Sequence, residues 1–320
     1  MTDFSKTNIH CSSIGYIIGS DKRKSNMQKY QDAVAKQLEY ISKYDVLAEH
    51  LKDKATGWGM VKKINEWGEK VKELELIKDN EPLSNMAKWH LKNIYGYAKY
   101  HKWNATSDKG TKFTNKGNMV EKDSIELLSR IKNVPLVKNE IRVNNDFLTG
   151  IPDAFIGPNI YEAKYIIDVK SSWDIQSFLN NLGKPLYSLY WWQIQGYLAI
   201  TGAQVGEVAY CLVNTPQSLI NNEIYRLKDR LDIVTDEDPI FLTKEAELIN
   251  NLMFDDMPEK ERVLRFLVER DDEAIEKVYR KVELCREYMQ EIEEMHNEGV
   301  FLAKEPESGE ESEENNEYSD

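Results

Sequence analysis

The 320-residue sequence has few cysteines and no long apolar run, and both shortages exclude classes of protein. Cys11, Cys211 and Cys285 have no paired spacing, which disfavours a disulfide framework, a zinc site and a four-cysteine iron–sulfur cluster. No apolar segment approaches the length that crosses a bilayer, and the N-terminal residues lack a signal-peptide pattern. No P-loop, Gly-rich dinucleotide turn or internal repeat is present. We therefore expect a cytoplasmic protein with buried, reduced thiols and no membrane contact.

The chain also lacks a net basic charge, since its formal net charge is -13, and this disfavours a nucleic-acid partner at first sight. Residues 305–320 hold eight of the acidic residues and no basic one, which leaves only -5 for the rest. Locally, Tyr97 to Lys116 has five lysines against one aspartate, with Tyr100, Trp103 and Phe113 among them. This mixture suits contact with a phosphate backbone and stacking of bases. A solvated helix end with partly buried aromatic rings explains the segment equally well.

The sequence is organised around residues 150–172, which predict a β-hairpin. Two extended runs, Phe147 to Ile156 and Tyr161 to Val169, are separated by the turn residues Gly157, Pro158 and Asn159. Because side chains alternate between the two faces of a strand, we expect one acidic side chain of each strand to reach the same place.

The acidic residues in question are Asp153 and Asp168, and Lys170 shares the strand face of Asp168. Two carboxylates beside a backbone carbonyl make a hard-oxygen site that suits Mg²⁺ (or Mn²⁺), whose bound waters can attack a phosphate. The Lys170 ammonium can orient the water or offset charge on the reacting phosphate. The alternative is an ordinary solvated face, with Asp153 in a turn after Pro152.

The segments GIPDA and IIDVKSS, with fourteen residues between Asp153 and Asp168, together resemble the PD-(D/E)XK nuclease core. At Asp168 the sequence has Asp in place of the more familiar Glu of the motif, and this variant resembles the one in RecB-like, lambda-exonuclease-like and YqaJ-like phage enzymes. The resemblance implies an α/β fold with a mixed central sheet flanked by helices, with helical insertions. It also implies a metal-dependent deoxyribonuclease that acts on DNA, in which Asp153, Asp168 and the Val169 carbonyl hold metal and Lys170 positions the water.

Two predicted helices add candidate residues for the metal site. In the helix predicted for Asn115 to Ile131, Glu121 shares a face with apolar residues and resembles the GxxxE glutamate at the metal centre of lambda-type enzymes. The alternative for Glu121 is a first-turn residue favoured by the helix dipole. In the helix predicted for Tyr190 to Gly202, Gln193 lies on one face with Tyr190 and Tyr197, like the YxxQxxxY pattern of RecB-like nucleases. Heptad spacing favours Gln193 over Gln195 as the glutamine that faces the site.

The N-terminal stretch Ile9 to Gly19 predicts a short helix capped by Ser12 or Ser13, and it resembles the serine-containing opening of phage exonucleases that lies against DNA. A plain helix cap explains these serines as well. The side chains expected to contact DNA are Ser12, Ser13, Lys112, Lys116, Ser171, Gln195 and Tyr197.

The remaining pattern predicts helices from Ser25 to His101, a strand from Lys138 to Asn145, a loop or short helix from Trp173 to Leu186, a strand from Glu207 to Val213, and helices again from Asp255. In the last of these, a stripe of apolar residues from Ile275 to Ile292 can pack on the core or on another subunit. We expect an N-terminal helical region (1–105), a nuclease core (106–235), a C-terminal helical region (236–302) and a disordered acidic tail (303–320).

Together these patterns favour a Mg²⁺-dependent DNA exonuclease of phage-type recombination, repair or genome processing. The alternative is a catalytically silent nuclease-like protein that binds DNA as a recombination scaffold. Linear duplex DNA is the expected partner. A single-strand annealing protein, attracted by the acidic tail, and a second copy of the chain are further partners that the sequence allows.

Overall fold

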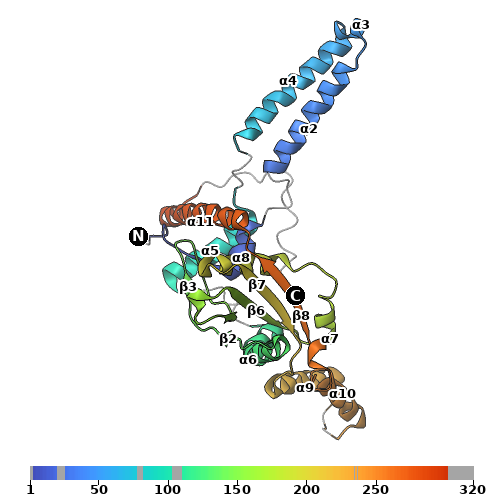
Figure 1. Ribbon diagram of the computed structural model, residues 1–320, viewed down its shortest axis with the longest axis vertical. Helices are drawn as coiled ribbons and strands as arrows, with labels where there is room; N and C mark the ends of the chain where they lie inside the picture. The colour runs from blue at the N-terminus through green and yellow to red at the C-terminus, as the bar shows by residue number, and fades with distance from the viewer. Residues whose placement is uncertain are drawn as a thin grey trace.

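The computed structural model describes residues 3–19, 26–77, 82–102, 110–233, 235 and 237–301. Its centre is a five-stranded mixed sheet in the order β2-β5-β6-β7-β8 (Figure 1). The strands are β2 (Val137–Lys138), β5 (Ala154–Ile156), β6 (Tyr165–Ser171), β7 (Val205–Cys211) and β8 (Val263–Glu269). Only β6 and β7 run parallel, and the other neighbours are antiparallel. The α/β fold class with helices on a mixed sheet is therefore confirmed.

Helices cover both faces of this sheet. Helix α6 (Lys112–Lys132) packs Val120, Leu127 and Leu128 against Ile167 and Val169 on one face. Helix α8 (Ser188–Thr201) covers the opposite face, where its apolar residues meet those of β6 and β7. Both helices have definite ends: the Thr111 side chain accepts from the Thr114 amide at the start of α6, and Gly202 ends α8 with a φ of 77°.

A smaller sheet holds the N-terminal residues against α8. It has the order β1-β4-β3 and consists of β1 (Ile9–His10), β3 (Val143–Asn144) and β4 (Leu148–Gly150). The 3-10 turn η1 (Cys11–Ser13) and helix α1 (Ile14–Ile18) follow β1. A Cβ on Gly196 of α8 would lie 2.4 Å from the Ile14 side chain and 3.0 Å from Cys11 Sγ. Only glycine allows this close approach.

Two helices complete the layer beyond α8. Helix α5 (Asn85–Tyr100) packs on α1 and on the long helix α11 (Asp272–Glu298), and α11 also contacts α1 and α8. The predicted apolar stripe of α11 is buried within the chain, with Val282, Cys285 and Met289 fully covered. One hydrophobic cluster thus joins residues from the N-terminal, central and C-terminal parts of the chain. All three cysteines are buried free thiols, as expected.

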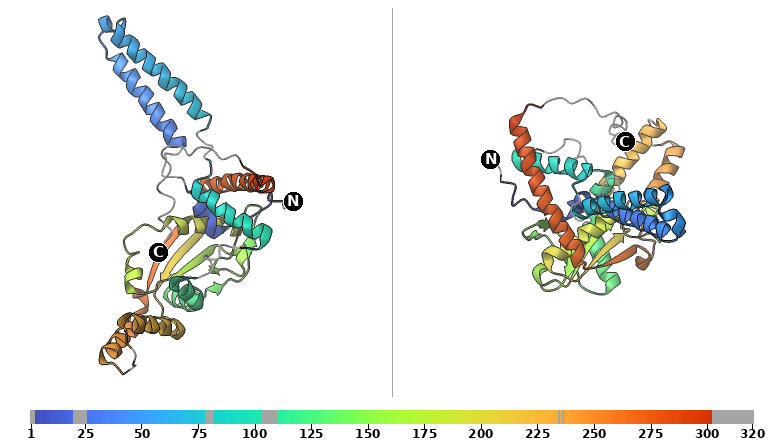
Figure 2. Two further views of the ribbon diagram at one scale, coloured as in Figure 1. Left: turned by 180° about the vertical axis from the view of Figure 1, so that it is seen from behind. Right: turned by 90° about the horizontal axis from the view of Figure 1, so that it is seen from above.

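Two helical pairs lie outside these layers. One consists of α2 (Asn26–Asp45), the short α3 (Glu49–Lys52) and α4 (Ala55–Glu75), which form a hairpin that stands away from the body (Figures 1 and 2). The other consists of α9 (Gln217–Leu231) and α10 (Pro239–Asn250), at the opposite end of the molecule. No described helix is both long and apolar enough to span a membrane.

Several sequence-based boundaries are wrong. The segment after Asp255 is not wholly helical, because β8 precedes α11 and forms an edge of the main sheet. The expected strand from Lys138 to Asn145 is interrupted between β2 and β3, and the run from Phe147 to Ile156 is divided between two sheets. Tyr161 lies in the 3-10 turn η2 (Ile160–Glu162) rather than in a strand. The predicted N-terminal helices begin at Ser25, which lies outside the described residues. The predicted disordered tail, residues 303–320, and residues 103–109 also lie outside them.

Candidate active site

The two predicted acidic residues meet because β5 and β6 pair as an antiparallel hairpin. The register places Ala154 opposite Ile167, so Asp153 and Asp168 occupy the next pair of positions. Asp153 accepts a hydrogen bond from the Val169 amide at 2.7 Å through Oδ2. Asn139, which is buried, supports the same stretch: its amide side chain donates to the Pro152 carbonyl and its backbone N–H donates to the Asp153 carbonyl.

Asp168 is almost completely buried, with an exposed fraction of 1%. Its Oδ2 lies 2.6 Å from Nζ of Lys170 as an ion pair, yet it accepts no hydrogen bond of normal geometry. Burial alone would lower the pKa of Lys170, but the charges of Asp168 and Asp153 outweigh burial and raise that pKa. Lys170 is therefore a cation in this site, and its Nζ also lies 4.7 Å from the centre of the Tyr190 ring.

Burial and the neighbouring charge of Asp168 raise the pKa of Asp153 well above its usual range. Two carboxylates on directly opposite positions of neighbouring strands repel each other when both are ionised, and a bound cation relieves that repulsion. Burial and the same two carboxylates also raise the pKa of Tyr197. The raised pKa of Asp153 means that a second ionised carboxylate beside Asp168 is unfavourable, and Lys170 offsets this effect only in part.

Helix α8 lies on the sheet face opposite to α6, and from there its Gln193 reaches Asp168. Its Nε2 donates to Oδ1 of Asp168 at 3.1 Å and to the Tyr197 hydroxyl at 2.9 Å. Gln195 points elsewhere: its side chain donates to the Glu269 carbonyl and accepts from the Asp271 amide. Of the two glutamines, Gln193 is the one that faces the acidic pair.

Glu121 lies in the middle of α6, nine residues after the helix begins, so the explanation as a first-turn residue is wrong. Its carboxylate is 3.5 Å from Nζ of Lys138 and lines the same groove as Asp153 and Val169. The described residues contain no group of three or more histidine, cysteine, aspartate or glutamate side chains placed to hold a metal. The donor set already assembled is the pair of aspartates, and Mg²⁺ needs only one or two protein carboxylates beside waters and substrate phosphates.

The groove at this end of β6 has a volume of about 460 Å³. Aromatic, hydroxyl and amide side chains line it around the charged residues: Phe113, Thr114, Asn118, Ser171, Ser172, Trp173, Ser177, Asn181, Tyr190 and Tyr210. The sequence patterns did not select Asn139 or Tyr210. The buried position of Tyr210 on a strand next to β6 follows from the strand order alone, which the sequence does not report.

The structure divides the side chains expected to contact DNA. Ser12 is exposed, Ser13 is half-buried without a capping hydrogen bond, and the Ser171 hydroxyl lies in the groove 2.9 Å from that of Ser124. Lys112 forms an ion pair with Glu223 and is partly exposed.

The other three expected DNA contacts are enclosed. Lys116 and Gln195 each have an exposed fraction of 0%, and Tyr197 has one of 5% with its hydroxyl turned to Gln193. A covered side chain cannot touch a nucleic acid. The expectation of direct contact is therefore corrected for Lys116, Gln195 and Tyr197.

A mixed sheet with an acidic hairpin, a lysine two residues after the second aspartate and a glutamine helix against one face is the arrangement expected from the sequence resemblance to the PD-(D/E)XK core. The fold is shared with a phage-related exonuclease from Haemophilus somnus 129PT, at a TM-score of 0.54 and 22% identity, over 91% of this chain and 97% of that chain. An alkaline exonuclease from Laribacter hongkongensis is less similar, at a TM-score of 0.45 and 13% identity, over 70% of this chain and 90% of that one. No protein-family model and no curated protein matches the sequence.

Proposed function

We propose that this protein is a Mg²⁺-dependent deoxyribonuclease that hydrolyses phosphodiester bonds of linear duplex DNA as an exonuclease. The observation that carries the proposal is a groove lined by Asp153 and Lys170, with the buried Asp168 paired to Lys170 and hydrogen-bonded by Gln193 behind it. The likeness in fold to a phage-related exonuclease supports it, and a role in phage-type recombination, repair or genome processing belongs to the same proposal.

Asp153 and Asp168 would hold the divalent cation, with the Val169 carbonyl and Glu121 as further oxygen donors. Three features fit such an ion: Oδ2 of Asp168 is buried without a hydrogen bond, the pKa of Asp153 is raised by burial and by Asp168, and all four donors are hard oxygens. When bound, Mg²⁺ or Mn²⁺ would lower the pKa of a water and neutralise charge on the phosphate.

The chain's own residues then have separate tasks. Lys170 donates from its ammonium to a phosphate oxygen or to the attacking water, and the raised pKa keeps its proton in place at neutral pH. Gln193 fixes the Asp168 carboxylate through Oδ1, so that Oδ2 is left toward Lys170 and the cation. Phe113, Tyr190 and Tyr210 offer aromatic surface for the sugar and base beside the reacting phosphate.

End-labelled linear duplex and closed-circular DNA, each with Mg²⁺, Mn²⁺ or EDTA, test this function. We expect the linear substrate to be degraded from its ends, the circle to survive, and EDTA to stop the reaction. Asp168→Asn and Lys170→Met should abolish cleavage, whereas Lys164→Met, on the exposed part of the same hairpin, should not. Cleavage by both site variants at the wild-type rate would refute the site.

The same assay separates the enzyme from a DNA-binding scaffold. A scaffold would shift the linear duplex in a gel without cutting it, whatever the metal. The intact pair of aspartates with its lysine favours the enzyme, because a protein that only binds phosphates has no need to bury two carboxylates in its groove.

A further inference from the structure

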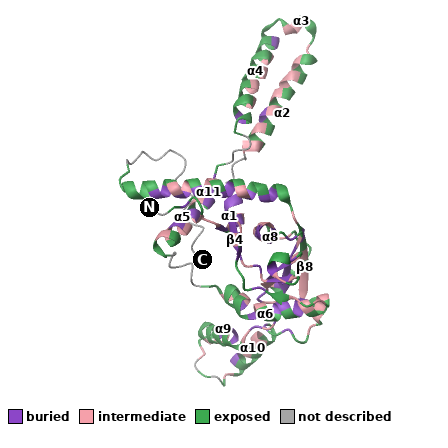
Figure 3. Cartoon of the chain, turned by 60° about the vertical axis from the view of Figure 1, so that its left-hand side comes forward, coloured by how far each residue is buried: buried purple, intermediate pink, exposed green. Residues whose placement is uncertain are grey.

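The hairpin of α2, α3 and α4 buries very little of its own surface. Among residues 26–77 only Ala33, Gly57 and Leu74 are fully buried, and Figure 3 shows the hairpin as largely exposed or intermediate. Its extensive element contacts are internal, between α2 and α4 and between α3 and α4. Two helices in water gain most of their stability from packing an apolar face, so this hairpin has an incomplete interface.

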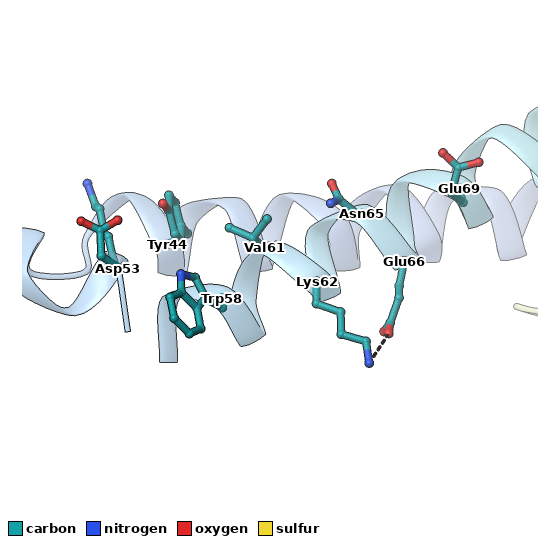
Figure 4. Close-up of a pocket in the computed structure, with 9 residues that line it drawn as sticks. Tyr44, Asp53, Trp58, Val61, Lys62, Asn65, Glu66 and Glu69 are labelled. Atoms are coloured by element: carbon teal, nitrogen blue, oxygen red, sulfur yellow. Dashed lines mark ion pairs between the residues drawn. The ribbon is translucent and has the colours of Figure 1, made fainter. Parts of the chain in front are cut away.

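An open groove of about 620 Å³ runs along the outer part of the hairpin (Figure 4). At its centre Trp58 is 66% exposed and Val61 is 39% exposed, and Tyr44 of α2 lies beside them. On α4 the residues that line the groove recur at steps of three and four: Trp58, Val61, Lys62, Asn65, Glu66 and Glu69. This spacing makes one continuous stripe on a helix.

The charge along the hairpin changes sign from end to end. The outer half, residues 36–64, has six lysines and four acidic residues, while residues 26–35 and 65–77 have three lysines and five acidic residues. Within the groove itself, Asp53 lies at the outer end, Lys62 in the middle, and Glu66 and Glu69 toward the body (Figure 4), while Lys52 is a further lining residue, so the change of sign belongs to the whole hairpin and not to the groove lining alone. The outer half therefore has a net charge of +2 and the inner half a net charge of -2.

We propose that this groove is the interface with the hairpin of a second copy of this chain, packed antiparallel about a two-fold axis near Val61. In that arrangement the basic outer half of each hairpin lies against the acidic inner half of the other. Lys54 of one copy comes opposite Glu69 of the other, and Trp58 comes opposite Asn65. A patch that is apolar at its centre and opposite in charge at its two ends is complementary to itself under a two-fold rotation.

The charges argue against DNA as the occupant. Residues 26–77 have nine lysines and nine acidic residues, so the hairpin has no net positive charge to follow a phosphate backbone. Lys52, Lys62 and Lys63 each lie within ion-pair distance of a glutamate on their own helix. With the axis near Val61, residues 55–68 of α4 lie opposite the same residues of the second copy, which makes a helix contact about 21 Å long.

Sedimentation velocity of the full-length protein across a range of concentrations tests the interface without any DNA. We expect a reversible monomer–dimer equilibrium, and we expect Trp58→Ala to raise the dimer dissociation constant at least tenfold. Tyr225→Ala is the matched control, because Tyr225 is a 73% exposed aromatic residue on α9, away from the hairpin. A wild-type monomer at every concentration, or a dimer that Trp58→Ala leaves unchanged, would overturn the proposal.

Disulfide trapping tests the antiparallel direction, and the three native cysteines are buried and do not compete. Lys54→Cys and Glu69→Cys, purified separately, should cross-link efficiently only when mixed, since the proposed axis places position 54 opposite position 69. Efficient cross-links within the Lys54→Cys sample alone would mean a parallel arrangement and would contradict the proposal. Because neither position lies near Asp168, these results do not depend on nuclease activity.

Discussion

Lys116 is a lysine that the folded protein encloses completely, and replacing it with methionine should stabilise the fold at acidic and neutral pH. The side chain has an exposed fraction of 0%, and its Nζ donates one hydrogen bond, of 3.0 Å, to the Trp173 carbonyl. The rings of Trp173 and Phe254 lie 5.8 and 5.1 Å from Nζ. No described carboxylate forms an ion pair with it. Burial lowers the pKa of Lys116 from 10.5 to about 7, opposed only in part by the charge of Asp174.

The direction in which stability changes with pH follows from proton binding. Between pH 7 and 10.5 the unfolded chain holds a proton on Lys116 that the folded chain has released, so wild-type stability rises with pH in that window. Each pH unit corresponds to about 1.4 kcal/mol, which makes the cost of burying this lysine about 5 kcal/mol at pH 6 and about 2 kcal/mol at pH 9. Methionine removes the cost and loses the hydrogen bond to Trp173, worth about 1 kcal/mol.

Lys116→Met should therefore be more stable than wild type by about 4 kcal/mol at pH 6 and by about 1 kcal/mol at pH 9. Urea unfolding at pH 6.0, 7.5 and 9.0 measures this difference. Lys112→Met, one turn earlier on α6 and partly exposed beside Glu223, is the control and should show little dependence on pH in its difference from wild type. A Lys116→Met difference that is the same at all three pH values would refute the reasoning.

Three substitutions and one truncation separate functional from structural roles. Gln193→Leu should lower kcat about 10- to 100-fold by freeing the Asp168 carboxylate, whereas Gln195→Leu should lower kcat much less and cost about 1 to 3 kcal/mol in urea unfolding, since two partly buried backbone groups lose their partner. Glu121→Gln should abolish Mg²⁺-dependent cleavage with an unchanged melting temperature; normal activity would exclude it as a ligand. A chain that ends at Lys304 should bind DNA more tightly at low salt, with the advantage lost as salt increases; equal affinity throughout a salt titration would show that the acidic tail does not compete with DNA.

The hairpin and its site could be predicted from the sequence because their signals are local. The pairing of β5 with β6 brings Asp153 opposite Asp168, but the connection between these strands runs from Gly157 to Lys164 and includes η2, so the turn residues Gly157 to Asn159 alone do not give this register. The heptad spacing likewise selects Gln193 before any contact is known. The antiparallel pairing of the two strands and the side of α8 that carries Gln193 agree with the structure, whereas the strand predicted to begin at Tyr161 and the serine cap of α1 do not.

The failures involve contacts between distant segments. The β8 sequence VLRFLVE shows no strict alternation of apolar and polar residues, and its neighbour β7 is more than fifty residues away, so nothing local distinguishes it from the helix that follows. Lys116 falls in a lysine-rich segment, and nothing local indicates that Phe254 and Trp173 enclose it. A lysine-rich segment can be predicted to lie on the surface only when the elements that pack against its helix are known.

The chain beyond residue 262 contributes no candidate ligand to the site, but it supports the site by positioning helix α8. The helix is covered on most sides, so both of its amide side chains must find buried partners. Gln193 bonds Asp168, and Gln195 bonds the turn between β8 and α11 at Glu269 and Asp271. Arg270 adds a hydrogen bond to the Leu198 carbonyl from the same turn. The C-terminal strand and helix therefore fix the rotation of α8, and that rotation determines whether Gln193 reaches the carboxylate.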